Sequence, residues 1–349
     1  MSETAASPPR SRRGRWALVL LLAALPFTLL VASVVGSVSL SPRAVINSLL
    51  AAAGLPGSPS TLGPQGEAIL WSVRLPRVLL AALVGGGLAV VGAALQSVFR
   101  NPMADTGLLG VGAGAALGAV LAVRLGLATE VFFALPLAAF AGALTAVAAV
   151  YVLAHASGPP SLHGLLLTGL AVSALAGAGT SVLLVATEEF RVKTVLFWLA
   201  GGLEGRSWTH VQLAAGFILT GTALLFALSR PLDLLSLGED EAASLGLPVH
   251  AARMAILCAA SLIAGAATSV AGAVPFVGLI APHALRPVVG PLGRHLIPAS
   301  FLGGALLVVV ADIGARTLSS RIELPLGSLT ALVGAPYFLL ALRANEGRG

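Results

Sequence analysis

Asp312 is the residue with the clearest capacity for chemistry in this chain, because it is an acid inside a long apolar run. An ionisable group in such surroundings is costly and is usually paired or functional. Arg316 follows four residues later, one turn along a helix, so the two side chains can form an ion pair. This spacing favours structural pairing over a direct part in moving a solute.

The other reactive residues do not form a catalytic or metal-binding constellation. His283 has no second ligand at a suitable spacing, which favours structural capping over metal binding. The single cysteine, Cys258, lies in an apolar run and cannot form an intrachain disulfide. The chain carries neither a GxxxxGK[ST] phosphate-binding motif nor a Ser/His/Asp arrangement. We therefore expect no catalysis by this chain alone, and no metal or cofactor bound to it.

The composition is that of a membrane protein: 57% of the 349 residues are hydrophobic and only 10% are charged. Soluble domains carry about 25% charged residues. In lipid only helices and closed barrels satisfy the backbone, and apolar runs such as 16–35 are too long and unbroken for barrel strands. The basic residues behind the net charge of +6 sit singly in loops, which indicates lipid headgroups as partners and not nucleic acid.

Hydropathy and length predict an all-helical membrane protein with about ten transmembrane helices. The first is expected to be retained and not cleaved as a signal peptide. The predicted spans are 16–36, 78–98, 106–123, 131–154, 161–186, 211–228, 252–271, 275–289, 296–315 and 325–342. We expect 37–72 to be an external loop with an amphipathic piece at 42–53, and 195–199 to be a short interfacial helix.

The chain also contains an internal repeat. Gly92 and Gly272, each followed by alanine, precede a proline by ten residues, whereas Pro136 and Pro298 precede a Gly-Ala-Leu by six residues. The first copy starts on the second span and the second copy on the seventh, and these spans run in opposite directions. The pattern predicts an inverted repeat, as many transporters show.

The longest polar segment after the first loop is 229–250, called the coupling segment below. It is amphipathic and acidic, and it contains Glu241, Ala242, Ala243, Gly246 and Leu247. We expect two short helices separated by Gly246, which form a knob for a partner; a solvated turn is the alternative. The pattern is similar to the loop with which membrane subunits of ATP-binding-cassette (ABC) importers dock their ATPases.

Several sequence blocks resemble the FecCD family of iron-siderophore, haem and cobalamin importer permeases. The blocks are RLPR with Gln96, NPMA and GLLG at 74–110, AGAVPFVGLIAPHALR at 271–286, Asp312 with Arg316, ELPLG at 323–327 and GAPYF at 334–338. Met103 and Pro275 are small departures. The resemblance implies a type II ABC importer permease of ten helices.

The resemblance also implies partners and site residues. A second permease copy or a close homologue, two cytoplasmic ATPase subunits that hold ATP and magnesium, and an extracytoplasmic substrate-binding protein are expected. Arginines at the outer mouth, here Arg74, Arg77 and Arg316, would dock the binding protein. The fifth span would line the pathway, where Thr168, Ser173, Thr180 and Ser181 are the polar residues.

The sequence thus predicts a permease that moves an iron-siderophore-type cargo, or haem or cobalamin, across the cytoplasmic (inner) membrane. Residues 1–15 and 344–349 would be tails, with both termini cytoplasmic, around one permease domain at 16–343. The alternative is a secondary transporter driven by an ion gradient. That alternative would need acids within the membrane for coupling, and Asp312 is the only clear one.

Overall fold

The structure is a computed structural model that describes residues 10–36, 38–55, 61–131, 133–156, 162–318 and 323–346. In these ranges all regular structure is helical. The elements are α1 (Arg10–Val34), α2 (Pro42–Ala52), α3 (Gly63–Ala68), η1 (Ile69–Arg74), α4 (Leu75–Val98), η2 (Thr106–Leu109), α5 (Val111–Arg124), α6 (Leu127–Glu130), α7 (Ala134–His155), α8 (Leu162–Val185), α9 (Glu189–Ala200), α10 (Trp208–Ala227), α11 (Ser229–Leu237), α12 (Glu239–Ser244), α13 (Val249–Ala271), α14 (Val277–Val289), α15 (Gly293–Thr317) and α16 (Leu326–Glu346).

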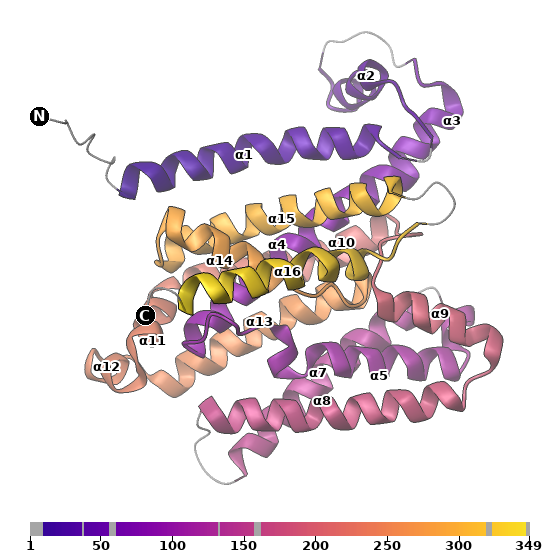
Figure 1. The fold of residues 1–349 in the computed structure, drawn as a ribbon. Helices are drawn as coiled ribbons and strands as arrows, with labels where there is room; N and C mark the ends of the chain where they lie inside the picture. Colours follow the sequence, from indigo (N-terminus) through magenta and orange to yellow (C-terminus); the bar gives the residue numbers. More distant parts are fainter. Residues whose placement is uncertain are drawn as a thin grey trace, which may run out of the picture.

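The ten predicted spans each correspond to a helix of one bundle (Figure 1). Among the described residues, seven helical stretches are long and apolar enough to cross a membrane, and 111–124, 277–289 and 326–340 are shorter apolar helices. We call the end where α4 begins and α15 ends the arginine end, and the end with α11 and α12 the coupling end. Helix α1 begins, and α16 ends, at the coupling end (Figure 1).

The non-spanning helices lie mostly where the sequence places them. Helix α2 coincides with the predicted amphipathic piece, and α9 is the predicted interfacial helix, extended to Glu189–Ala200. Helix α1 starts at Arg10, within the predicted N-terminal tail. The side chains of its first residues lie outside the described part of the chain, so the tail and domain boundaries stay a prediction.

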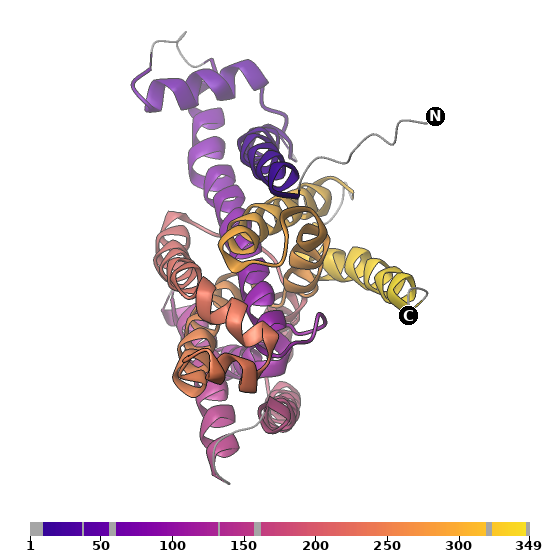
Figure 2. The ribbon, with the colours of Figure 1, turned by 90° about the vertical axis from the view of Figure 1, so that its left-hand side faces the viewer.

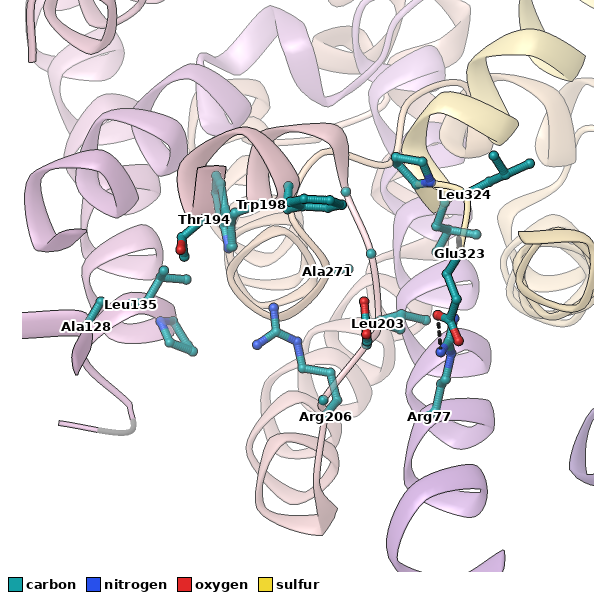
Figure 3. A pocket seen from close by; sticks show the side chains of 18 residues that line it. Arg77, Ala128, Leu135, Thr194, Trp198, Leu203, Arg206, Ala271, Glu323 and Leu324 are labelled. Atoms are coloured by element: carbon teal, nitrogen blue, oxygen red, sulfur yellow. Dashed lines mark hydrogen bonds and ion pairs between the residues drawn. The ribbon is translucent and has the colours of Figure 1, made fainter. Parts of the chain in front are cut away.

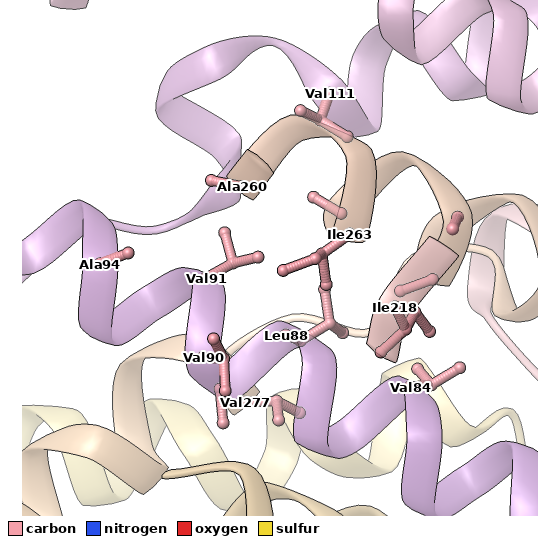
Figure 4. Packing of buried hydrophobic residues seen from close by; sticks show 14 of the residues in the cluster. Val84, Leu88, Val90, Val91, Ala94, Val111, Ile218, Ala260, Ile263 and Val277 are labelled. Atoms are coloured by element: carbon pink, nitrogen blue, oxygen red, sulfur yellow. The ribbon is translucent and has the colours of Figure 1, made fainter. Parts of the chain in front are cut away.

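Helix α4 is the centre of the packing. Almost all of its residues are buried, and it contacts α15, α13, α14 and α10. Val84, Leu88 and Val91 of α4 meet Ile218 of α10 and Ile263 of α13 in the main core (Figure 4). Viewed from the coupling end, α4 runs through the middle of the bundle and α16 stands at its side (Figure 2).

Glycines allow these helices to approach until their backbones touch. A Cβ atom at Gly92 would lie 1.8 Å from the carbonyl oxygen of Gly278 on α14. The same crossing is bridged by Gln96, whose amide donates to Gly278 O at 3.2 Å and whose oxygen accepts from Arg286 at 3.2 Å. Because lipid provides no hydrophobic drive between helices, this close contact is what holds α14 against α4.

The repeat rests on two pairs of sequence motifs, and the structure shows where the glycines of each pair lie. Gly92 lies inside α4, but Gly272 ends α13 with a left-handed φ of 67°. Gly142 and Gly304 both lie at close crossings, where Cβ atoms would lie 2.2 and 2.3 Å from the carbonyl oxygens of Gly114 and Gly85, but Gly142 packs on α5 and Gly304 on α4, which are not counterparts in the repeat. The inverted repeat therefore stays a prediction.

Replacing Gly92 by alanine is predicted to destabilise the protein, because the new methyl group would overlap the Gly278 carbonyl. We expect a cost of about 1–3 kcal/mol, seen as a lower Tm of the detergent-purified protein. Gly216→Ala is the matched control, since a Cβ at that helical position on α10 meets nothing within 4 Å. Equal Tm values for the two variants would contradict the crossing described here.

Candidate functional site

The predicted pair of Asp312 and Arg316 is part of a larger buried network at the arginine end. Arg77 Nε donates to Asp312 Oδ1 at 2.9 Å, and its terminal nitrogen donates to Glu323 at 2.7 Å. Arg316 Nε lies 3.0 Å from Asp312 Oδ2 as an ion pair. The Asp312 carboxylate thus joins α4 to α15, and Glu323 adds the segment before α16.

Two of the arginines also cap the end of α1. Arg74 donates to the carbonyl oxygens of Ser33 and Val34 at 3.0 and 2.5 Å, and Arg316 donates to those of Ala32 and Val35 at 3.1 and 2.9 Å. The last carbonyls of a helix have no partner within it and carry the negative end of its dipole. Guanidinium groups therefore stabilise α1 where it ends.

These contacts bear on the predicted docking arginines. Arg74, Arg77 and Arg316 do lie together at one end of the bundle, but their side chains face inward and are only 5%, 8% and 9% exposed. Arg74 and Arg316 donate to backbone carbonyls at the end of α1, and Arg77 donates to Asp312 and Glu323. The structure thus gives all three a structural role, which the sequence indicated only for Arg316 through its pairing with Asp312, and docking stays a prediction.

A cavity of about 380 Å³ opens beside this network. Arg77 and Glu323 form one wall, and Trp198 of α9 and Arg206 of the following loop form the opposite side (Figure 3). At Gly201, which also lines the cavity, the backbone packs directly against that of Ala273. Gly201 has a φ of 74°, and a Cβ atom there would lie 2.1 Å from the Ala273 carbonyl oxygen.

The cavity contains polar groups with unused hydrogen-bonding capacity. Trp198 Nε1 and Arg206 Nε are buried and have no hydrogen-bond partner within the described ranges. Burial lowers the pKa of Arg206 from its usual value, although the group stays a cation at neutral pH. A donor and a cation beside a cavity suit an anionic or carbonyl oxygen. Sequence reasoning missed both residues, since neither lies in a recognised block.

The coupling segment folds as a compact knob of two short helices, α11 and α12. The break between them is at Gly238 and not at Gly246, so that detail of the prediction is wrong. Gly238 has a φ of 142° and ψ of 159°, whereas Gly246, with a φ of 81°, follows α12 and turns the chain into α13. Both positions need glycine, and the spacing of the sequence alone did not distinguish them.

The knob is braced against the bundle. Asp233 accepts a hydrogen bond from the Gly293 amide at 2.7 Å at the start of α15, and Glu239 is ion-paired with Arg253 of α13. Burial raises the pKa of the Asp233 carboxyl, and the Gly293 hydrogen bond opposes that rise. Movement of the knob would thus be passed to both α13 and α15.

The predicted coupling residues divide into two groups. Ala242 is fully buried and Leu247 is half-buried, so they hold the knob together. Glu241, Ala243 and Gly246 are exposed. Leu237 and Leu245 are also exposed, and they add an apolar surface that the sequence interpretation left out.

The polar residues of α8 mostly bond to their own helix. Thr180 and Ser181 donate to the carbonyls of Ala176 and Gly177 at 2.8 and 3.1 Å. Ser173 Oγ is buried without a partner in the described ranges, and Thr168 is half-buried. None of these contacts tests whether the four residues line a pathway, which stays a prediction.

Asp312→Asn is predicted to destabilise the permease strongly, since it leaves two buried guanidinium groups without their shared anion. We expect a loss of about 3–5 kcal/mol, measured as a fall in Tm in detergent. Glu323→Gln is the matched control: it removes the half-exposed carboxylate on Arg77, and its cost should be near the ~1 kcal/mol of an exposed pair. If Asp312→Asn lowers the Tm no more than Glu323→Gln does, the central role of the Asp312 carboxylate is refuted.

Comparison with known proteins places these features in a family. Residues 21–344 match the FecCD transport family. The chain is 45% identical to the cobalamin import system permease protein BtuC of Halobacterium salinarum, over 81% of this chain and 75% of that protein. It is 40% identical to the hemin transport system permease protein HmuU of Yersinia pestis, over 80% and 85%, and 38% identical to the Fe(3+)-citrate import system permease protein YfmE of Bacillus subtilis, over 93% and 94%.

A solved structure agrees with the fold. It is described as an inward-facing conformation of a metal-chelate type ABC transporter, and it matches with a TM-score of 0.83 and 31% identity over 94% of this chain and 98% of that one. The protein is thus a multi-pass permease subunit of an ABC importer, and such subunits have no catalytic activity. The ion-gradient-driven alternative is not supported. With both sequence and fold matched over most of its length, the chain belongs to the FecCD transport family.

Proposed function

We propose that this permease imports a metal chelate of the iron-siderophore type, with haem or cobalamin as the other candidates. The support is the identity of 38–45% to permeases named for Fe(3+)-citrate, hemin and cobalamin. The cavity lined by Arg206 supports an oxygen-rich cargo, because a guanidinium cation suits a carboxylate or carbonyl oxygen. A ferric chelate carries such oxygens at its surface.

The coupling segment of each permease copy is proposed as the docking site for one ATPase subunit. Two permease copies would thus dock two ATPase subunits. Its exposed Leu237, Leu245 and Ala243 provide a small apolar surface, and Glu241 provides charge at its edge. ATP and magnesium would be held by those ATPases and no cofactor by this chain. Closure of the ATPase pair would move the knob, and the Asp233 and Glu239 contacts would carry that motion to α15 and α13.

This assignment also sets the orientation. If the coupling end faces the cytoplasm, α1 begins and α16 ends on the cytoplasmic side of the inner membrane. The arginine end then faces outward, where a substrate-binding protein would dock near Arg74, Arg77 and Arg316. Acidic side chains of that partner would be attracted to the cluster at this end, in which three arginines outnumber the carboxylates of Asp312 and Glu323.

A second copy of the permease, or a close homologue, is proposed to complete the pathway along α8. Much of this helix is exposed in the single chain, including Leu167, Leu175 and Val182. Thr168, Ser173, Thr180 and Ser181 would then supply the polar positions of a pathway between two α8 helices. Ser181 is the exposed member of this set, so it is the one best able to contact a passing solute.

The function is tested by ATP-dependent uptake into vesicles that contain the permease, its ATPase and its binding protein. We expect uptake of a ferric siderophore, and Leu245→Glu is expected to lower uptake and ATPase co-purification by about tenfold or more, because it places a charge in the apolar docking surface. Leu125→Glu is the matched control, since Leu125 is 61% exposed at the opposite end and Leu245 is 60% exposed. Uptake of only haem or cobalamin would correct the cargo, and uptake without ATPase or ATP would overturn the function.

The docking role is tested by Arg74→Gln and Arg316→Gln in the same preparation. If the arginines dock the binding protein, each variant should weaken its affinity by about tenfold at low salt, and less at high salt. The exposed Arg294 at the coupling end supplies the control Arg294→Gln. Each Tm is measured alongside, because these residues also cap α1. A Tm loss with unchanged affinity would show that their part is structural only.

A further inference from the structure

Two histidines distant in sequence meet at the coupling end. His155 is the last residue of α7, and His250 is the second residue of α13. Their Nε2 atoms lie 3.4 Å apart, and the Tyr151 hydroxyl lies 3.2 Å from His250 Nε2. His250 is exposed, and His155 and Tyr151 are half-buried, so the group is open to solvent.

The tautomer of His155 follows from its hydrogen bond. Its Nδ1 lies 2.8 Å from the backbone carbonyl oxygen of Tyr151, one turn earlier on α7. A carbonyl oxygen can only accept, so Nδ1 carries the proton and Nε2 of the neutral ring presents a lone pair. Histidine ligands of metal ions are commonly fixed in this way, with one ring nitrogen bonded to a carbonyl and the other left for the metal.

The distance between the two Nε2 atoms fits a shared metal ion. Nitrogen ligands bind Zn²⁺ at about 2.0–2.1 Å in a tetrahedron, which places two such nitrogens about 3.3–3.4 Å apart. Without an ion, two ring nitrogens at 3.4 Å can satisfy each other only if one of them holds a proton. We propose that His155 and His250 bind one divalent transition-metal ion such as Zn²⁺ or Co²⁺.

The rest of the coordination sphere would be water. The described residues contain no group of three or more His, Cys, Asp or Glu side chains that could hold a metal ion. The Tyr151 hydroxyl lies 3.2 Å from the His250 Nε2 that would bind the ion, so in the bound state it would turn to a metal-bound water, and its ring lies tilted beside His155 with centroids 3.9 Å apart. Imidazole nitrogens with open water positions suit zinc, cobalt, nickel or copper and do not suit magnesium or calcium.

The location gives the site a consequence. A bound ion would tie the last turn of α7 to the first turn of α13, where the coupling segment ends. This inference rests on the imidazole geometry and not on the proposed cargo or on docking of an ATPase. It can therefore be tested on the isolated permease, and its failure would leave the proposed function untouched.

Co²⁺ titration of the full-length permease, purified with a tag that contains no histidine, tests the site. We expect one Co²⁺ per chain, with the visible absorption of a nitrogen-bound Co²⁺ ion, and displacement of that ion by Zn²⁺. His155→Gln and His250→Gln should each weaken binding by at least about tenfold. His295→Gln should leave binding unchanged, because His295 is a half-buried histidine of α15 outside the pair.

A second measurement needs no variant. Zn²⁺ should protect His155 and His250, but not His295, from modification by diethylpyrocarbonate, as mapped by mass spectrometry. The proposal is overturned if Co²⁺ binding is absent, if the His295 variant loses as much affinity as the other two, or if Zn²⁺ protects all three histidines equally.

Discussion

The arrangement of helices at the arginine end depends on one carboxylate in a region of low dielectric constant. Asp312 is 1% exposed and lies between the guanidinium groups of Arg77 and Arg316. Without it, two buried cations would repel each other, and their desolvation would have no compensation. Through Arg316 the same anion also supports the cap on α1, so three helices from distant parts of the chain depend on it.

Close backbone packing is the second constraint, and it follows from the lipid solvent. Since apolar side chains gain little by leaving lipid for another helix, association needs contact surfaces of small residues and a few polar bonds. Gly92 against Gly278, and Gly304 against Gly85, provide such surfaces about two turns apart on the same side of α4. Gln96 and Arg286 add polar bonds at the first of these crossings.

The sequence could predict the spanning helices because length and hydropathy are local properties. It could also predict the pairing of Asp312 and Arg316, which lie one turn apart. It could not predict that Arg316 meets the end of α1, or that Arg77 meets Glu323, because those partners are separated by hundreds of positions. For the same reason the sequence could not predict the cavity at Arg206 or the contact of His155 with His250. The helix break at Gly238 was missed because Gly238 and Gly246 were both suitable for it.

The long helical stretch 63–98 has a mechanical consequence. Its 36 residues extend about 54 Å, whereas the hydrocarbon core is about 30 Å thick. The surplus would extend beyond the lipid at the arginine end, where Ser48 of α2 is hydrogen-bonded to Glu67 and Trp71 and the Trp71 carbonyl accepts from Trp208. A force applied to α2 from outside would therefore act on a helical stretch whose other half, α4, is almost entirely buried. The π-helical turns Ile69–Arg74 lie between the two halves, so bending of the stretch would be concentrated there.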